Sequence, residues 1–175
     1  MFDRPSPLNE EIKFGVDEII VSKTDTRGYL TYANDVFCRV AEMSTHDVIG
    51  KPHAIIRHPD MPRAVFKLLW ETIKGGNEIF AYVKNMSATG RYYWVIAHVT
   101  PSFAPDGSIS GFHSNRRCPS RKGISDIEPL YQRLLDEERK HSNPKDGLAA
   151  SYQYLTDMLA EKQVSYSKFI WSTGE

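Results

Sequence analysis

The stretch that decides the fold runs from Ile79 to Arg116 and reads IFAYVKNMSATGRYYWVIAHVTPSFAPDGSISGFHSNR. It holds three runs rich in β-branched and aromatic residues. Each gap between them carries a turn signal, with Gly90 in the first gap and Gly107 in the second. This pattern predicts three successive antiparallel strands over residues 79–85, 92–102 and 109–116.

The residues before this stretch predict two further strands and several helices. Short β-rich runs at 19–21 and 29–32 flank a turn over 25–28, which is typical of a hairpin. Asn34 can cap a helix, a further helical turn ends at Gly50, and Pro62 suits the start of a helix that Gly75 stops. The order predicts an α+β fold, a five-stranded antiparallel sheet with flanking helices.

The last fifty residues predict a helical hairpin over residues 125–167. A capping box at Ser125 and Glu128 precedes an apolar stripe, a break follows at residues 142–144, and a second amphipathic helix comes after it. Two such helices must bury their stripes, on the sheet or on a second chain. We divide the chain into an N-terminal arm (1–17), a central domain (18–119) and a C-terminal helical extension (120–175).

Composition excludes several classes of function. Lys and Arg number 22, as do Asp and Glu, so a zero net charge gives no reason to expect a nucleic-acid partner. No apolar run is long enough to cross a membrane, and the start resembles no signal peptide, so we expect a cytoplasmic protein without membrane insertion. Cys38 and Cys118 form no paired motif, and hydrolase, P-loop and kinase signatures are missing, so we expect no enzyme.

Several motifs resemble one known family. Residues 29–34, read with Phe37, resemble the opening of a PAS domain. Residues 56–62, Ile-Arg-His-Pro-Asp-Met-Pro, together with 83–85, Val-Lys-Asn, and 93–95, Tyr-Trp-Val, are similar to the PAS domain of bacterial aerotaxis receptors. The resemblance covers about residues 18–119. It implies the PAS fold, a pocket between sheet and helices, and FAD held without a covalent bond.

The resemblance also implies a role in signalling. Aerotaxis-type PAS domains read redox or oxygen state, so we expect a sensor that reports to a chemotaxis transducer in energy taxis. Because this sequence carries no membrane segment or signalling rod, we expect a stand-alone partner of a chemoreceptor or another signalling protein. Two amphipathic helices outside the central domain favour a homodimer.

The loop before the central helix supplies three candidate cofactor-binding residues, Arg57, His58 and Asp60. Arg57 can hold a phosphate through a forked pair of hydrogen bonds, and the start of the following helix favours an anion. The alternative is that Arg57 and Asp60 pair with each other and only make the loop rigid. The resemblance places this loop beside the flavin ring or its phosphates.

Three further candidates are Asn85, Trp70 and Trp94. Asn85 offers both a donor and an acceptor, which suits the pyrimidine edge of a flavin, although an Asn near a turn can also act as a cap. Either tryptophan can stack on a planar ring, and either can be plain core. Where relatives often carry Trp-x-Gly before the Val-Lys-Asn motif, this chain has Ile79 and Ala81.

Two alternatives keep the fold and change the cofactor. His53, His58, His98 and His113 are possible axial ligands, so a gas sensor with haem b is one alternative. The other is a protein-interaction module without a cofactor. We expect no metal ion bound directly by side chains.

Overall fold

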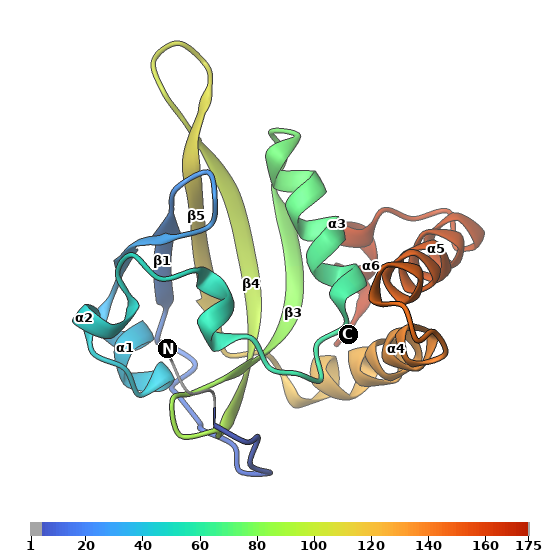
Figure 1. The fold of residues 1–175 in the computed structure, drawn as a ribbon, viewed down its shortest axis with the longest axis horizontal. Helices are drawn as coiled ribbons and strands as arrows, with labels where there is room; N and C mark the ends of the chain where they lie inside the picture. The colour runs from blue at the N-terminus through green and yellow to red at the C-terminus, as the bar shows by residue number, and fades with distance from the viewer. Residues whose placement is uncertain (1–4, 175) are drawn as a thin grey trace.

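A five-stranded antiparallel sheet forms the centre of the structure, a computed structural model that describes residues 5–174 (Figure 1). The spatial order of the strands is β2-β1-β5-β4-β3. Their bounds are β1 Ile20–Thr24, β2 Leu30–Ala33, β3 Ile79–Met86, β4 Tyr92–Phe103 and β5 Ile109–Arg117. The predicted strands and turns are therefore confirmed to within a few residues, as is the fold class.

The register of β3 and β4 divides their side chains between two faces. Ile79 pairs with Val99 and Asn85 pairs with Tyr93, without a bulge between them. Since side chains alternate along a strand, the odd-numbered residues of both strands share one face, which we call the inner face. Even-numbered residues, including Phe80 and Trp94, lie on the outer face.

Helices before β3 cover the inner face. They are α1 Asp35–Ala41, α2 Thr45–Val48, a 3-10 turn His53–Ile56 and α3 Arg63–Lys74. The Asn34 side chain accepts a hydrogen bond from the Phe37 amide at 3.0 Å, so the predicted cap is confirmed. The helix α3 begins after Pro62 and ends at Gly75, as the sequence predicts.

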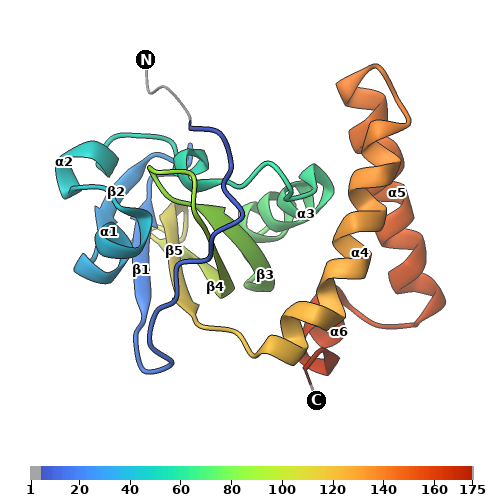
Figure 2. The same ribbon diagram turned by 90° about the horizontal axis from the view of Figure 1, so that it is seen from below.

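Three C-terminal helices pack on the same chain: α4 Arg121–Arg139, α5 Pro144–Glu161 and α6 Tyr166–Ser172. Figure 2 shows α4 and α5 as a hairpin beside α3, while α6 lies against β3. The Tyr131 hydroxyl on α4 donates to the Tyr82 carbonyl at 2.5 Å. The hairpin thus buries its apolar stripe on its own α3 and sheet.

Two details of this region differ from the prediction. The helix α4 starts one turn earlier than the Ser125 capping box, because Ser120 accepts a hydrogen bond from the Gly123 amide at 3.0 Å. The hydroxyl of Ser125 instead donates to the carbonyl of Lys122. The third helix, α6, was not expected, and its buried Tyr166 and Ile170 join the core.

One carboxylate ties the hairpin to α3. Glu138, near the end of α4, accepts hydrogen bonds from the Arg63 Nε at 3.0 Å and the Ala64 amide at 3.2 Å. Its side chain is only 9% exposed. Because Pro62 makes no side-chain cap, Glu138 supplies from a distant part of the chain the acceptor that a local capping residue normally provides.

The described part of the N-terminal arm also packs on the sheet. The amide of Ile12 donates to the Tyr92 carbonyl at 2.8 Å. Glu11 binds Arg121, the first residue of α4, through two hydrogen bonds of 2.8 Å. Residues 1–4 of the predicted arm lie outside the described residues.

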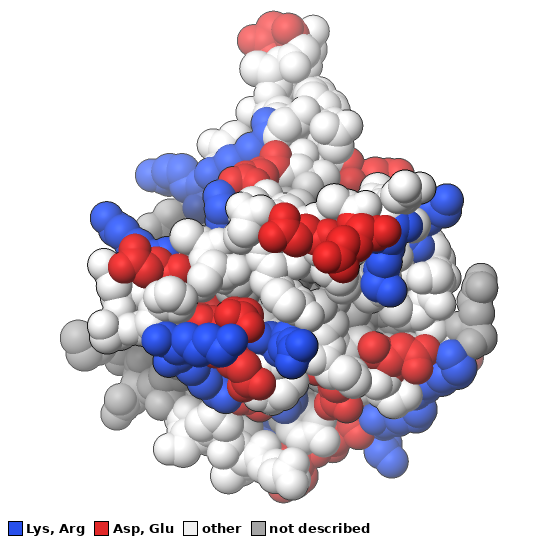
Figure 3. All heavy atoms as spheres, turned by 90° about the vertical axis from the view of Figure 1, so that its right-hand side faces the viewer, with Lys and Arg blue, Asp and Glu red and all other residues white. Residues whose placement is uncertain are grey.

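The face that carries α4 and α5 mixes both signs of charge (Figure 3). Acidic and basic side chains alternate across it, and several form pairs within one helix, such as Lys122 with Asp126 at 2.8 Å. No helix among residues 5–174 has the length and apolar character needed to span a bilayer.

Replacing Gly147 by alanine is expected to lower the free energy of unfolding by about 1–3 kcal/mol, the usual cost of overpacking. A Cβ atom there would lie 2.5 Å from the Glu138 carbonyl oxygen, which is backbone and cannot rotate away. Urea unfolding followed by circular dichroism measures the change, with the exposed Lys145→Ala as the control in the same helix turn. Equal losses of unfolding free energy in both variants would show that α5 does not pack this closely against the end of α4.

Candidate functional site

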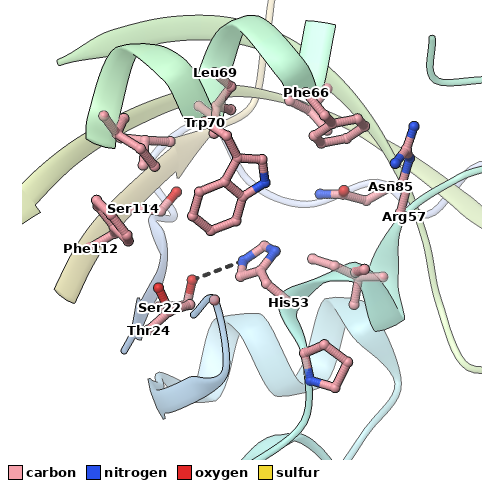
Figure 4. A pocket seen from close by; sticks show the side chains of 18 of the residues that line it. Ser22, Thr24, His53, Arg57, Phe66, Leu69, Trp70, Asn85, Phe112 and Ser114 are labelled. Atoms are coloured by element: carbon pink, nitrogen blue, oxygen red, sulfur yellow. Dashed lines mark hydrogen bonds between the residues drawn. The ribbon is translucent and has the colours of Figure 1, made fainter. Parts of the chain in front are cut away.

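A cavity of about 420 Å³ lies between the inner face of the sheet, α3 and the 3-10 turn (Figure 4). This volume falls within the range of small-molecule sites. Most of its wall is apolar, from Phe66, Leu69 and Ile73 on α3 and from Val83, Ala97 and Val99 on the sheet. It forms because the two strands put small and medium side chains on the inner face, so α3 does not fill the space against them.

Three of the predicted site residues meet at this cavity: Arg57, Trp70 and Asn85. The Trp70 ring projects from α3 into it and packs edge-on against Phe112, with the ring centroids 5.5 Å apart. Asn85 is 3% exposed, and its backbone forms a bridge with that of Arg57. This bridge ties the Arg-His-Pro-Asp loop to the end of β3.

The Arg57 guanidinium lies 4.1 Å from the centroid of the Phe66 ring, and both residues line the cavity. One of its nitrogens also donates to the Met61 carbonyl at 3.4 Å. Three other basic residues line the cavity, and each is paired with a carboxylate: Arg27 with Asp25, Arg63 with Glu138, and Lys67 with Glu71.

The other three predicted residues lie elsewhere. Trp94 is on the outer face, 6% exposed and stacked on Tyr131 of α4, and does not line the cavity. His58 is 2% exposed and accepts a hydrogen bond from the Asp60 amide at 3.1 Å. The Asp60 carboxylate pairs with Lys84 at 3.0 Å, on the outer face. These residues shape the loop and the sheet rather than the cavity wall.

The sequence reasoning missed a polar cluster at the inner end of the cavity. Arg116 on β5 is 2% exposed and donates to the Ser22 hydroxyl at 2.6 Å and to the His53 Nε2. The dashed line in Figure 4 marks the contact between Ser22 and His53, at 3.2 Å. Alternation along residues 109–116 puts Arg116 on the same face as buried Phe112, and that signal was available in the sequence.

Burial controls the protonation of this cluster. Loss of hydration, together with the nearby charge of Arg116, lowers the pKa of the His53 imidazole to about 3. His53 is thus neutral, and its Nε2 accepts a hydrogen bond. Burial also lowers the pKa of Arg116 to about 10, which still leaves the guanidinium charged at neutral pH.

Three buried polar atoms around the cavity lack a hydrogen-bond partner within residues 5–174: Thr24 Oγ1, Ser114 Oγ and Arg116 Nη1. All three residues line the cavity wall. Buried donors are nearly always paired, so a group of three around one cavity indicates a missing polar partner. A flat, largely apolar ring with polar atoms along one edge fits these walls.

The positions where this chain departs from its relatives do not block the cavity. Ile79 and Ala81 are buried on β3 but are not among the residues that line it. Among residues 5–174 there is also no group of His, Cys, Asp and Glu side chains placed to hold a metal ion.

Comparison with known proteins agrees with this architecture. The family model described as the PAS fold matches residues 30–115. The aerotaxis receptor of Escherichia coli strain K12 is 37% identical over 134 residues, which is 77% of this chain and 26% of the receptor. The nitrogen fixation regulatory protein of Klebsiella pneumoniae is 27% identical over 116 residues, 66% of this chain and 22% of that protein. The chain thus spans about a quarter of the length of these relatives.

Solved structures with the same fold include two of very different origin. The light-state structure of the blue-light photoreceptor Aureochrome1 LOV has a TM-score of 0.55 at 20% identity, over 67% of this chain and 91% of that one. A PAS domain from Colwellia psychrerythraea has a TM-score of 0.54 at 14% identity, over 59% of this chain and 87% of that one. The chain belongs to the PAS fold family, and its PAS domain is of the bacterial aerotaxis receptor type.

Proposed function

We propose that this protein is a sensor that binds FAD without a covalent bond and reports redox or oxygen state to a chemotaxis transducer. The observation that carries the proposal is the cavity itself, a largely apolar slot whose wall also holds Arg57 and three buried polar atoms without a hydrogen-bond partner among residues 5–174. Bound flavin supplies reversible oxidation and reduction. The resemblance to aerotaxis receptors supports the same assignment.

The lining residues suit the parts of such a ligand. Trp70 offers a broad aromatic surface to a planar ring, and Asn85 offers a donor and an acceptor to the ring edge. Arg57 suits a diphosphate, because a guanidinium group binds phosphate oxygens through paired hydrogen bonds.

A route from the cavity to the C-terminal helices supports a signalling role. The helix α3 forms one wall of the cavity, and it also packs on α5 of the hairpin. Glu138 binds its first turn, Tyr152 of α5 donates to Glu71, and Leu148 of α5 reaches the cavity wall. A shift of α3 that follows a change in the ligand would therefore move the hairpin. The expected homodimer remains a prediction, since the hairpin packs on its own chain.

The haem alternative rests on one histidine. Of the described histidines only His53 lines the cavity, and its Nε2 already accepts a hydrogen bond from Arg116. Iron would have to displace that contact. His98 pairs with Glu78 and His113 with Asn115, both on the outer face, so neither can reach a ligand in the cavity.

A visible absorption spectrum of freshly purified protein tests the proposal. We expect the two broad bands of flavin, present at purification or after addition of FAD. A sharp Soret band would establish the haem alternative, and a folded, colourless protein that takes up no added FAD would establish a module without a cofactor. In either case the flavin proposal is wrong.

Alanine variants of two adjacent lining residues extend this test. Arg57→Ala and Asn85→Ala are each expected to weaken FAD binding by about 10-fold or more, since each removes hydrogen bonds to a polar or charged group. Asn115→Ala is the matched control, because Asn115 lies on the outer face and bonds only His113 among the described hydrogen bonds. Fluorescence titration of the ligand-free proteins measures all three, and unchanged affinity in both site variants would place the ligand elsewhere.

A further inference from the structure

A second hollow of about 350 Å³ lies on the outer face of the sheet, between α4 and the strands β3 and β4. We call it the outer groove. Three of its lining residues are buried and largely apolar, Trp94, Tyr131 and Leu135, whereas Asp60 and Glu128 are exposed. It shares no lining residue with the cavity on the inner face, so the two are separate. Its volume lies within the range of small-molecule sites.

An indole N–H opens into the outer groove without a partner. Trp94 is only 6% exposed, and its nitrogen makes no hydrogen bond within residues 5–174. That nitrogen is nevertheless not closed to water, and the outer groove is the opening that Trp94 lines. Because the N–H of a buried tryptophan usually has a partner, this atom indicates that a ligand acceptor binds in the groove.

The opposite wall, on α4, offers a free acceptor. Pro129 stands inside this helix and has no amide hydrogen, so the Ser125 carbonyl lacks the donor that a helix normally supplies. Both residues line the outer groove. Pro129 is exposed, so its ring adds nothing to the core, although a proline inside a helix lowers stability. A ligand that donates to the free carbonyl would explain why α4 carries this residue.

The charges along the outer groove are unequal. Its lining holds two carboxylates, on Asp60 and Glu128, and one ammonium, on Lys84. Lys84 pairs with Asp60 at 3.0 Å, whereas the Glu128 carboxylate forms no ion pair or hydrogen bond in the described part of the chain. An ammonium group has three donors, so one such group could bind both Glu128 and the Ser125 carbonyl.

We propose that the outer groove is a second ligand site, which binds a small primary ammonium compound with a neutral carbonyl oxygen and an apolar body, such as the amide of an α-amino acid. The carbonyl oxygen accepts a hydrogen bond from the Trp94 indole. The ammonium donates to Glu128 and to the Ser125 carbonyl. The apolar body covers Tyr131 and Leu135. This site goes beyond the flavin function and does not depend on it.

Nuclear magnetic resonance of the isotopically labelled full chain tests the site, because its three tryptophans give three indole N–H signals. The probe is leucinamide at a pH of about 6.5, where its amine is charged. We expect the indole signal that is absent in Trp94→Phe to move downfield, with a dissociation constant of about 1 mM, while the other two stay in place. N-acetyl-leucinamide lacks the ammonium and should bind about 10-fold more weakly.

Variants on α4 separate a ligand site from a packing feature. Pro129→Ala restores the missing amide hydrogen, so it should raise the thermal midpoint and yet weaken leucinamide binding by about 3- to 10-fold. Glu128→Gln removes the free carboxylate and should weaken binding by about 10-fold or more. Glu137→Gln is the matched control, because Glu137 lies on the same helix outside the groove and pairs with Lys140. Backbone amide signals give the affinity in each variant.

Three results would overturn the second site. One is a Trp94 indole signal that does not move at tens of millimolar leucinamide. Another is equal binding of leucinamide and its N-acetyl form, and the third is unchanged affinity in both Pro129→Ala and Glu128→Gln. If Trp94→Phe does not fold, the two variants on α4 decide alone. None of these results bears on the flavin proposal, which the absorption spectrum tests separately.

Discussion

Lowering the pH from 6.5 to 4.5 is expected to destabilise the ligand-free protein by about 2 kcal/mol, chiefly through His53. Burial and the charge of Arg116 hold the pKa of His53 at about 3 in the folded state, whereas the unfolded value is 6.5. Between these values the unfolded chain binds a proton that the folded chain does not. Stability is therefore complete above pH 6.5 and falls as the pH drops toward 3.

The full slope would be about 1.4 kcal/mol per pH unit, and we expect somewhat less because the His53 ring borders a cavity that water can enter. Urea unfolding at several pH values measures it. His53→Gln, which keeps an acceptor for Arg116, should flatten the curve in this window, whereas His113→Gln on the outer face should not. A wild-type curve that is already flat would mean that His53 is protonated in the folded protein.

The window ends at pH 4.5 because a carboxylate titrates below it. Although burial raises the pKa of Glu42, hydrogen bonds from Arg91, Ser87 and Thr89 lower it to a net value of about 2. The stability that this group contributes is present above about pH 4.5 and is lost only as the pH falls toward 2. Measurements above pH 4.5 thus isolate the histidine.

Replacing Trp70 by alanine is expected to abolish retention of FAD during purification. The indole projects into the cavity and also contacts Gly28, whose position for a Cβ lies 2.9 Å from the ring. The substitution removes both the stacking surface and part of the cavity wall. Stacking of a planar heterocycle on one aromatic side chain contributes about 1–3 kcal/mol to binding. The ratio of flavin to protein absorbance measures the effect.

Trp94→Ala is the matched control on the other face of the sheet. It removes the stacking on Tyr131 and is expected to lower the free energy of unfolding by about 3 kcal/mol or more. The folded fraction should nevertheless keep its flavin. The reverse result, with flavin lost in Trp94→Ala and kept in Trp70→Ala, would place the ligand on the outer face.

The strands were predictable because their signals are local. Residues 79–116 alternate β-formers with clear turns, and the hairpin of β1 and β2 has the same pattern. The start of α4 was not predictable at the same precision, because Ser120 and Ser125 are equally good caps in the sequence. Packing decides between them, since Gly123 must approach Tyr82 closely where α4 begins.

The division of the site residues between two faces was harder to predict for a different reason. In a sheet with one exposed face, polar residues mark the outer side and reveal toward which face a tryptophan on a strand points. Here α4 and α6 cover the outer side of β3 and β4, so both sets of alternating residues are largely apolar. The strand pattern therefore does not reveal that Trp94 points away from the cavity, which Trp70 on α3 lines.

The cap that Glu138 places on α3 has a consequence for how the chain is divided. During synthesis Arg63, in the first turn of α3, leaves the ribosome 75 residues before Glu138, whose carboxylate completes that turn. A fragment that stops at residue 119, the boundary of the PAS domain as the sequence suggests it, would release Arg63 and the Ala64 amide and expose Trp94. The first turn of α3, the helix that lines the cavity, would then fray. Because Leu148 of α5 also lines the cavity, cutting the chain between the sheet and the C-terminal helices would remove part of the cavity wall.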